Sequence, residues 1–453
     1  MFTTDFLSSL PNEITCAVLS YLSANELCQV SLCSKSCREK SNSDALWRRL
    51  LKNRGWEHYG TDLDLSKKTG FLKYEADDVI QEGYSANLMP TCKLKTAFIR
   101  ASRLEANWQT GTFQKHCISL SGVDCRDGIW DSDGEFVVYA FNEGVSIWSL
   151  EKSDGGHDVG GQAGSNTEDS DYYKRKLLPH PGWIAQSCKV SKGVGLATEY
   201  ENDCFVHTIR LFNCKSANWM MSYKEDDEAP TKKLRFDTKT LIGTSSCRPS
   251  ELIVWNSFNG SSRHVLKGHV SEIKDLALSD TRAASAAESV RLWDVEQGVC
   301  LHVFLPSVGF TCCHIVGEHL LGGFRDTLLF WNMVSKKQLA TITDFELRLM
   351  SVNNSIVACS DGCVRVWNNM GDLIKKHPTT GDKSEGIYEL LVGGTRVVIQ
   401  GRFKGLKVLN TGQSECKSPP VLFESGGLLQ MLWMDDLKLV VCREHKCEVL
   451  HFW

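Results

Sequence analysis

The chain has 453 residues, of which 42% are hydrophobic and 23% are charged, and its formal net charge is -4. This length is too great for one compact core and suits a small domain joined to a large one, or a repeat array. The slightly negative balance excludes a general nucleic-acid binder, which would carry a clear excess of Lys and Arg. No run of about 18 apolar residues occurs, so no segment is expected to span a membrane and no membrane partner is expected.

The N-terminal stretch and the cysteines both bear on the compartment. Asp5 and Glu13 lie in the first residues, which lack a basic segment, so no signal peptide is expected. The 19 cysteines are odd in number and scattered among apolar residues. Without a secretory signal we expect reduced thiols that act as small buried hydrophobes. The sequence therefore predicts an intracellular protein of the cytoplasm or the nucleus.

Three short helical patterns occupy the first fifty residues. In the first, which follows Pro11, the apolar residues recur at helical spacing: Ile14, Ala17, Val18, Tyr21 and Leu22. Ser23 to Glu26 has the form of a capping box that opens a second helix, and a third pattern runs from Ala45 to Leu51. Three short helices enclose too small a core to be very stable alone, so we expect the module to complete its burial against a partner.

Five sub-motifs are spaced over this region: Leu10–Ile14, Leu19–Ser23, Glu26–Cys28, Ser34–Lys35 and Leu46–Leu50. Together they resemble an F-box. The resemblance implies docking on the Skp adaptor, which hangs on the cullin scaffold of a ubiquitin ligase. The contact residues that it implies are Leu10, Pro11, Ile14, Leu19 and Leu22. The family often has Trp where this chain has Cys37, a departure that weakens one core or contact position.

A connector follows. Residues 55–90 show little apolar period, but from Thr91 onward apolar residues are spaced three or four apart: Leu94, Ala97, Phe98, Ala101, Leu104 and Trp108. This spacing predicts an amphipathic helix. Its tail, Arg103–Gly111, is similar to the segment that joins helix to propeller in F-box/WD-repeat proteins. The resemblance implies that this helix fixes the propeller's orientation, with Trp108 plugging the junction.

The rest of the chain repeats itself about every 40 residues. Each repeat ends in an aromatic or aliphatic residue followed by a polar one: Trp148-Ser149, Phe212-Asn213, Trp255-Asn256, Trp293-Asp294, Trp331-Asn332, Trp367-Asn368, Leu409-Asn410 and Leu450-His451. The period predicts a WD-repeat β-propeller of eight blades, with seven as the alternative. One longer interval is attributed to a disordered surface loop over Glu151–Asp171.

The expected architecture is mainly β, with an F-box over 1–52, a helical linker over 53–106 and a propeller over 107–453. Ring closure would pair the Asn107–Ser119 strand with the C-terminal strands near Cys442 to Trp453. Gly268-His269 precedes Trp293 at the spacing of one blade. Asp361 lies six residues before Trp367, as in the tight turn that ties His, Ser or Thr, and Trp together in well-formed repeats.

The resemblance also implies where a substrate would bind. In phosphate-reading members of the family, cations project from the start of the inner strand and from the turn before the third strand. The matching positions here are Lys274, Arg325 and Arg348, with Arg402 and Arg248 as looser matches. Arginine's planar fork suits bidentate phosphate binding, although acidic peptides would need the same charges. The alternative is that these cations are solvated or paired with neighbours such as Asp326.

No catalytic or metal centre is expected. Cys442, His445, Cys447 and His451 superficially resemble a zinc set, but alternate residues of a strand–turn–strand face opposite ways and do not converge. The sequence has no Gly-rich phosphate loop, no nucleophile elbow and no His-paired cysteine, which leaves little support for an enzyme and implies no cofactor.

Two readings of the function remain. The first is a monomeric substrate-recognition subunit of an SCF ubiquitin ligase, bound to the Skp adaptor and cullin through the F-box and to a protein substrate through the propeller. The alternative is a WD-repeat scaffold that binds the adaptor without leading to degradation. A propeller enzyme would need clustered carboxylates or histidines at the central channel, and the sequence indicates none.

Overall fold

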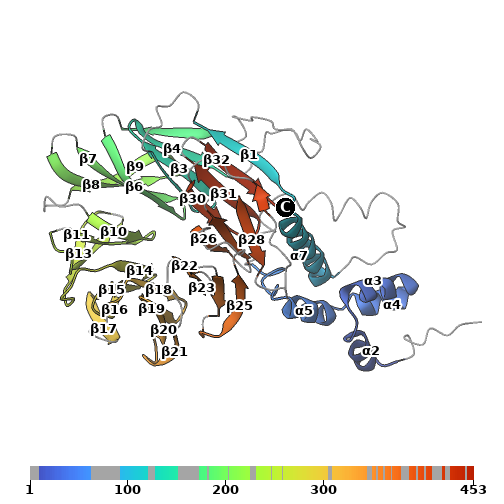
Figure 1. Ribbon diagram of the computed structural model, residues 1–453. Helices are drawn as coiled ribbons and strands as arrows, with labels where there is room; N and C mark the ends of the chain where they lie inside the picture. The colour runs from blue at the N-terminus through green and yellow to red at the C-terminus, as the bar shows by residue number, and fades with distance from the viewer. Residues whose placement is uncertain are drawn as a thin grey trace, which may run out of the picture. The chain divides into compact units, whose positions relative to one another are not determined.

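The chain divides into two compact units. The helical unit comprises Met1–Phe113, Gly412–Glu415 and Phe452–Trp453, and the sheet unit comprises Gln114–Thr411 and Cys416–His451 (Figure 1). In the computed structural model of the chain, the described residues are 10–62, 92–120, 128–150, 173–180, 183–201, 204–224, 231–245, 247–257, 259–304, 309–343, 349–352, 356–360, 363–368, 370–378, 387–393, 396–401, 405–410, 421–423, 429–443 and 446–452. The predicted loop over Glu151–Asp171 and the turn residue Asp361 lie outside these ranges.

The described part of the helical unit contains five helices: α2 (Asn12–Leu19), α3 (Ala24–Cys33), α4 (Lys35–Ser41), α5 (Asp44–Asn53) and α7 (Lys93–Thr110). No helix among the described residues is long and apolar enough to cross a bilayer. Four of the five helices match the predicted patterns. The fourth short helix, α4, is additional, because Cys37 is its single apolar residue and gives no period. Its start is fixed instead by the Ser34 hydroxyl, which accepts a hydrogen bond from the Cys37 N–H at 3.0 Å.

The predicted capping box at the start of α3 is confirmed. The Glu26 N–H donates to the Ser23 hydroxyl at 3.4 Å, and the Ser23 N–H donates to the Glu26 carboxylate at 2.7 Å. Two backbone donors that the helix itself cannot satisfy are thereby paired. At the start of α2 the cap residue is Pro11, which has no backbone N–H to leave unpaired. Leu27 faces inward and is fully buried.

The predicted amphipathic helix is α7, whose inner face is buried. The Phe98 ring contacts Trp47 edge-on at 5.4 Å and Trp56 at 5.5 Å between ring centroids. The Lys95 ammonium donates to the Asn42 side chain at 3.0 Å. The helix stops at Gly111, whose φ of 68° is left-handed and favours glycine. Aromatic burial therefore joins α5 and α7 into one core.

The last residues of the chain belong to the helical unit. The Phe452 ring stacks on Trp108 with centroids 3.5 Å apart and planes 9° apart, and both side chains are buried. The Asn107 amide donates to the Phe452 carbonyl at 2.7 Å. The final turn of α7 thus holds the chain's C-terminal residues.

The described strands of the sheet unit pair into eight four-stranded antiparallel sheets. The first four are sheet 1, β2 (Ile129–Ser132), β3 (Phe136–Phe141), β4 (Gly144–Ser149) and β5 (Arg175–Pro179); sheet 2, β6 (Trp183–Ser191), β7 (Val194–Glu201), β8 (Cys204–Asn213) and β9 (Asn218–Lys224); sheet 3, β10 (Thr231–Phe236), β11 (Thr240–Ser245), β12 (Leu252–Asn256) and β13 (Ser262–Leu266); and sheet 4, β14 (Asp275–Ser279), β15 (Arg282–Ala286), β16 (Val290–Asp294) and β17 (Val299–Phe304).

The other four are sheet 5, β18 (Cys312–Val316), β19 (His319–Phe324), β20 (Thr327–Asn332) and β21 (Gln338–Ile342); sheet 6, β22 (Leu349–Val352), β23 (Ile356–Ser360), β24 (Cys363–Trp367) and β25 (Leu373–Pro378); sheet 7, β26 (Ile387–Gly393), β27 (Arg396–Gly401), β28 (Leu406–Asn410) and β29 (Val421–Phe423); and sheet 8, β30 (Leu429–Met434), β31 (Lys438–Arg443), β32 (Lys446–His451) and β1 (Gln114–Ser119). The pairing agrees with eight repeats rather than seven.

The ring closes through sheet 8, whose outer strand β1 comes from the opposite end of the sheet unit. Gln114 pairs with His451 and Ser119 pairs with Lys446 in an antiparallel register. The closure between the two ends of the unit is therefore confirmed. The strand begins at Gln114 rather than at Asn107, because Asn107 to Thr110 form the last turn of α7.

Neighbouring sheets are held together by apolar side chains from the third strands. The hydrophobic residue of each repeat ending lies on this strand and is buried: Trp148, Phe212, Trp255, Trp293, Trp331, Trp367, Leu409 and Leu450. Clusters of buried residues each span two adjacent sheets, as where Trp367 of sheet 6 packs on Phe330 of sheet 5. Burial of the aromatic residues between sheets explains why they recur at the blade period.

In sheets 4, 5 and 6 the polar residue of the ending closes the next turn. The Asp294 carboxylate accepts hydrogen bonds from the N–H groups of Glu296 and Gln297 at 3.0 and 2.9 Å. Asn332 and Asn368 accept equivalent bonds in sheets 5 and 6. A side-chain oxygen at this position substitutes for a backbone acceptor, which is why Asp or Asn follows the aromatic residue.

Candidate interaction surfaces

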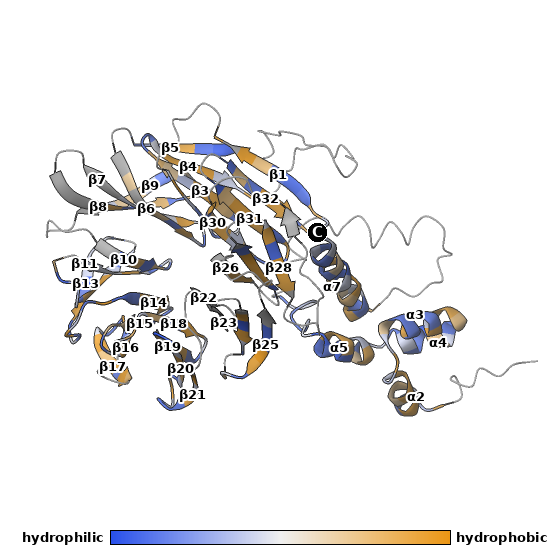
Figure 2. Cartoon of the chain, viewed as in Figure 1, coloured by the Kyte–Doolittle hydropathy of each residue, from blue (hydrophilic) through white to orange (hydrophobic). Residues whose placement is uncertain are grey.

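The first helix of the helical unit presents apolar side chains to solvent. Ile14 is 50% exposed, Val18 is 48% exposed and Tyr21, just beyond the helix end, is 89% exposed. Their spacing of four and three residues places them on one side of the helix. Pro11 is exposed as well, and Figure 2 colours most of α2 as hydrophobic. A contiguous apolar surface left in water indicates a docking site, and we name Pro11, Ile14, Val18 and Tyr21 the α2 face.

The other residues that the resemblance implied as contacts are less accessible. Leu19 is 1% exposed and lies in the core, and Leu10 and Leu22 are half-buried. Thr15, four residues before Leu19, is also buried, so these two residues mark the inward side of α2. Leu19 therefore lies on the buried side of α2, away from the exposed α2 face. Val18 and Tyr21 belonged to the predicted helical pattern, but the motif positions alone did not single them out.

Hydrogen bonds from α4 and α5 fix the two ends of α2. The Lys40 ammonium donates to the Leu10 carbonyl at 3.4 Å and to the Thr15 hydroxyl at 3.3 Å. The Arg49 guanidinium donates to the Leu22 carbonyl at 3.1 Å. These bonds hold the α2 face against the rest of the helical unit.

The position that departs from the family's usual Trp is a core position. Cys37 is buried in α4. The aromatic core residue is instead Trp47 of α5, whose indole N–H donates to the Ser41 carbonyl at 2.8 Å. Cys37 therefore belongs to the interior and not to the α2 face.

One end of the sheet unit gathers the loops that the sequence marked for substrate binding. Each sheet begins at the strand that contacts the first strand of a neighbouring sheet, as β14 contacts β10 and β18. The four strands of each sheet run antiparallel to one another. The turn between the second and third strands therefore lies at the same end of the sheet as the loop that leads into the next sheet. The Ile273 N–H, just before β14, donates to the Pro249 carbonyl of the β11–β12 turn at 2.8 Å. We call this end the loop face.

The predicted cations of sheets 3 and 4 lie on the loop face and are ion-paired. Lys274 is exposed, and its ammonium lies 2.5 Å from the Glu272 carboxylate. Glu251 accepts from Lys267 at 3.1 Å and lies 3.8 Å from Arg248. Lys274 is thus paired with Glu272, whereas Lys267 and Arg248 share Glu251.

Arg325 differs from the cations of sheets 3 and 4. It occupies the β19–β20 turn with a φ of 47°, is exposed, and has no ion pair with any residue in the described ranges, Asp326 included. Arg348 and Arg402 lie outside the described residues. Of the predicted substrate-binding cations, Lys274 and Arg325 are thus placed on the loop face of consecutive sheets.

A cluster of charged residues lies in sheet 8 and was not predicted from the sequence. The buried Glu448 carboxylate lies 3.3 Å from Lys115 of β1, 2.6 Å from Arg443 of β31 and 3.0 Å from Lys446 of β32. Burial alone would raise the pKa of Glu448, but hydrogen bonds from Lys446 and Arg443 outweigh it and lower that pKa. One carboxylate thereby ties three strands of the ring closure together. No sequence pattern links Lys115 with residues more than 300 positions away.

Comparison with known proteins assigns the N-terminal part. Residues 7–53 match the F-box-like family. F-box/WD repeat-containing protein pof1 of Schizosaccharomyces pombe is 39% identical over 83 residues, which cover 18% of this chain and 13% of pof1. Autophagy-related protein 16 of Arabidopsis thaliana is 28% identical over 127 residues, which cover 26% of this chain and 25% of that protein. The chain thus spans at most a quarter of the length of either relative.

A solved structure supports the fold of the larger unit. The computationally designed Ika8 protein aligns with a TM-score of 0.55 and 16% sequence identity, over 75% of this chain and all of Ika8. The F-box-like match, the named F-box/WD-repeat relative and the eight-sheet ring agree with one another. This combination of an F-box-like segment and a propeller is similar to that of F-box/WD-repeat proteins.

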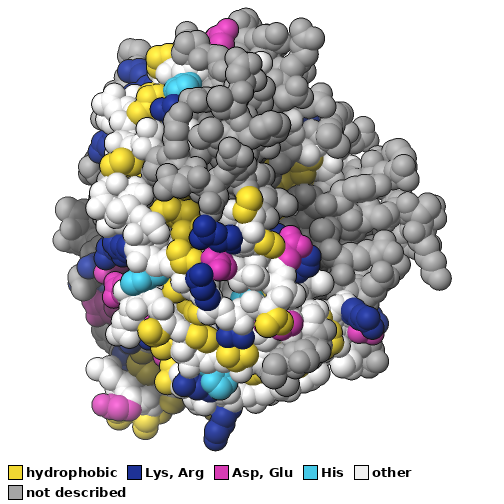
Figure 3. Space-filling model, turned by 90° about the vertical axis from the view of Figure 1, so that its left-hand side faces the viewer, with side chains coloured by type: hydrophobic (Ala, Val, Ile, Leu, Met, Phe, Trp, Pro, Cys, Tyr) yellow, Lys and Arg dark blue, Asp and Glu magenta, His cyan; other side chains and the backbone are white. Residues whose placement is uncertain are grey.

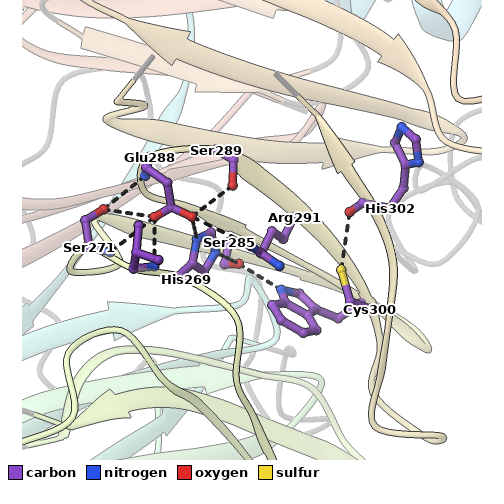
Figure 4. A network of polar contacts seen from close by, with 10 residues as sticks. His269, Ser271, Ser285, Glu288, Ser289, Arg291, Cys300 and His302 are labelled. Carbon is purple, nitrogen blue, oxygen red and sulfur yellow. Dashed lines mark hydrogen bonds and ion pairs between the residues drawn. The ribbon is translucent and has the colours of Figure 1, made fainter. Parts of the chain in front are cut away.

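The best-formed repeat is sheet 4, where a polar network fixes the loop face (Figure 4). The Trp293 indole donates to the Ser285 hydroxyl at 2.8 Å, and Ser285 lies 2.6 Å from the His269 Nε2 atom. The His269 Nδ1 atom lies 2.9 Å from the Glu288 carboxylate, which also accepts from Ser271 at 3.0 Å. Each member has a partner, so the network is rigid.

Burial lowers the pKa of His269, because the charged imidazole would lose its hydration. The neutral ring can then donate from Nδ1 to Glu288 and accept at Nε2 from Ser285. Glu288, in contrast, is stabilised in its charged form. Partial burial opposes its ionisation, but hydrogen bonds from His269, from its own backbone and from Ser271 lower its pKa to about 2. The carboxylate is therefore ionised throughout the physiological range.

The face of the protein drawn in Figure 3 carries Lys and Arg beside Asp and Glu, without an extended field of one sign. This agrees with the small net charge of the chain. Among the described residues, no three metal-ligating side chains come together. Cys442 and Cys447 are directly opposed across β31 and β32 and buried, and His445 lies outside the described residues. Burial raises the pKa of the Cys442 thiol.

Proposed function

We propose that this F-box/WD-repeat protein is the substrate-recognition subunit of an SCF ubiquitin ligase. The observation that carries the proposal is the exposed α2 face within the F-box-like segment, because an isolated unit gains nothing from exposing Ile14, Val18 and Tyr21. A Skp-type adaptor would cover this face. The cullin scaffold and the ubiquitin-transferring enzyme would be reached through that adaptor.

The propeller would bind the protein to be ubiquitinated on its loop face. Lys274 and Arg325 are exposed on consecutive sheets there, and Val270, which lies in the loop before β14, is 85% exposed. Positive charges together with an exposed apolar side chain on one face suit a peptide that carries acidic and apolar residues. The proposal extends to a monomeric receptor in which this chain contributes binding and other subunits contribute the chemistry.

The proposal is tested by the turnover of captured partners in cells that express either the wild type or Ile14→Asp. Partners bound through the propeller should lose ubiquitin and live several-fold longer with Ile14→Asp, because the chain still captures them but no longer reaches the ligase. Glu39→Gln on α4, exposed and outside the α2 face, serves as the control and should behave as wild type. Equal partner lifetimes in all three would contradict the receptor proposal and favour a scaffold.

A further inference from the structure

The outer rim of sheets 4 to 6 carries a run of exposed aliphatic side chains at the end opposite the loop face. Each lies in the turn between the third and fourth strands of its sheet or on the fourth strand, and their exposed fractions run from 36% to 73%: Val299, Val334, Leu339, Met370, Leu373 and Ile374. We call these six residues the aliphatic rim. Figure 2 colours β17 and the start of β25 as hydrophobic.

The aliphatic rim is one continuous surface because its three sheets are in direct contact. A Cβ placed on Gly371 of the β24–β25 turn would meet the Ala340 Cβ of β21 at 2.5 Å, so this turn of sheet 6 lies against sheet 5. The Lys336 ammonium donates to the Leu301 carbonyl of β17 at 3.4 Å, which joins sheet 5 to sheet 4.

Lysines flank the aliphatic rim. Lys336 and Lys337 follow Val334 in one turn, and Lys376 lies on β25 two residues after Ile374. All three are exposed, and none is ion-paired with a residue of the described ranges. This distinguishes them from Lys274 and Lys267 of the loop face, whose charges are balanced by glutamates. The rim therefore combines apolar side chains with three lysines that have no ion pair among the described residues, while its turns also carry the carboxylates of Glu296 and Asp372.

The corresponding rim of sheet 3 is less apolar, with Val265 of β13, 39% exposed, as its aliphatic residue. There the turn and the start of the outer strand carry Asn259, Ser261, Ser262 and Arg263. Because every blade has the same strand order, the fold does not require aliphatic residues at these positions.

We propose that the aliphatic rim binds the surface of a membrane that contains anionic lipid. Protein interfaces are enriched in Tyr, Trp and Arg and depleted in Lys, whereas this rim is aliphatic and flanked by lysines, with Glu296 and Asp372 as the acidic residues of its turns. The side chains lie on turns and outer strands, at the periphery of the sheets. Aliphatic insertion into the headgroup region together with lysine attraction to anionic lipid is how peripheral proteins attach without crossing the bilayer. The proposal differs from the sequence-based expectation that the chain has no membrane partner.

The test is sedimentation of the full chain with vesicles of phosphatidylcholine and phosphatidylserine, and with vesicles of phosphatidylcholine alone. The wild type should bind the first far better than the second, and added salt should weaken the binding. Lys337→Glu with Lys376→Glu should lower the partition coefficient about thirtyfold or more, since each cation near an anionic surface contributes roughly fivefold. Val334→Asp should also lose binding.

Two matched controls separate the aliphatic rim from general surface effects. Arg263→Glu makes the same change of charge per substituted residue on the equivalent strand of sheet 3, and Val270→Asp makes the same apolar-to-acidic change on the loop face. Both should bind vesicles as wild type does. Failure of the wild type to bind phosphatidylserine vesicles would overturn the proposal and leave the rim to a protein partner. Equal loss in the control and rim variants, or binding that ignores the lipid charge, would also overturn it.

Discussion

Glu288 is the residue whose ionisation most directly affects the repeat that it closes. It accepts hydrogen bonds from His269 and Ser271, and its pKa is lowered to about 2. A carboxylate with a lowered folded-state pKa contributes stability above its unfolded pKa, here 4.5, and this contribution is lost as the pH falls through the folded value.

Accordingly, the wild type should be more stable than Glu288→Gln above about pH 5, and the difference should narrow steadily as the pH falls below 4.5 toward 2. Urea unfolding of both proteins across this range measures the two free energies of unfolding. A difference that stays constant down to pH 3 would show that ionised Glu288 is not what the network requires.

Two single residues show what could not be predicted from the sequence. Asp361 was predicted to close a tight turn from its spacing to Trp367, whereas Glu288 closes the best-formed turn five residues before Trp293. The motif has an aspartate six residues before the Trp, so a glutamate five residues before Trp293 does not match it. Leu19 shows the same limit, because a motif position carried over from a family does not say which side of the helix is buried.

At the scale of elements, the β24–β25 turn joins sheets 5 and 6 through a glycine. Gly371 has a φ of 88°, and a Cβ there would meet the Ala340 Cβ at 2.5 Å. Gly309 has a similar φ of 79°, but nothing lies within 4 Å of its Cβ position. An alanine at Gly309 would therefore introduce backbone strain alone, whereas an alanine at Gly371 would add a steric clash.

We expect Gly309→Ala to cost about 1 kcal/mol of stability from backbone strain alone. Gly371→Ala should cost about 1–3 kcal/mol more, because two packed sheets must move apart. Thermal and urea unfolding of both variants measures the difference. Equal destabilisation would mean that the turn adapts without disturbing sheet 5.

Local chemistry decided which elements could be predicted. The α3 start was read from Ser23 and Glu26 because a capping box is a local hydrogen-bond pattern. Helix α4 was missed because its packing rests on Cys37 alone. The third strands were predicted from their endings, since burial of an aromatic residue and closure of the next turn by Asp294 or Asn332 both act within a few residues.

At the scale of the molecule, the chain's final residues hold the end of α7. Phe452 stacks on Trp108 at 3.5 Å and its carbonyl accepts from Asn107. Phe452→Ala should destabilise the protein by about 3–5 kcal/mol, the usual cost of deleting a buried aromatic side chain. Tyr21→Ala, which removes an exposed ring, should leave the stability within about 0.5 kcal/mol of wild type. Calorimetry of both variants checks this, and equal melting temperatures would contradict the structural role given to Phe452.

The whole ring was predictable in its period but not in the contacts that close it. Eight endings about 40 residues apart indicated eight blades, and the pairing of β1 with β32 followed from the need to leave no open edge. The group formed by Lys115, Arg443, Lys446 and Glu448 was not predictable, because its members come from both ends of the sheet unit. The aliphatic rim likewise appears only when three sheets are assembled.

The central claim is that the α2 face docks a Skp-type adaptor and so connects the propeller to a ubiquitin ligase. Its most direct test is the affinity of the full chain for purified Skp adaptor, measured by calorimetry for the wild type, Ile14→Asp and Glu39→Gln. We predict tight binding by the wild type and Glu39→Gln, and binding at least about tenfold weaker for Ile14→Asp, because a charge would replace an apolar contact at the interface. No binding by the wild type, or equal affinity for all three proteins, would contradict the account.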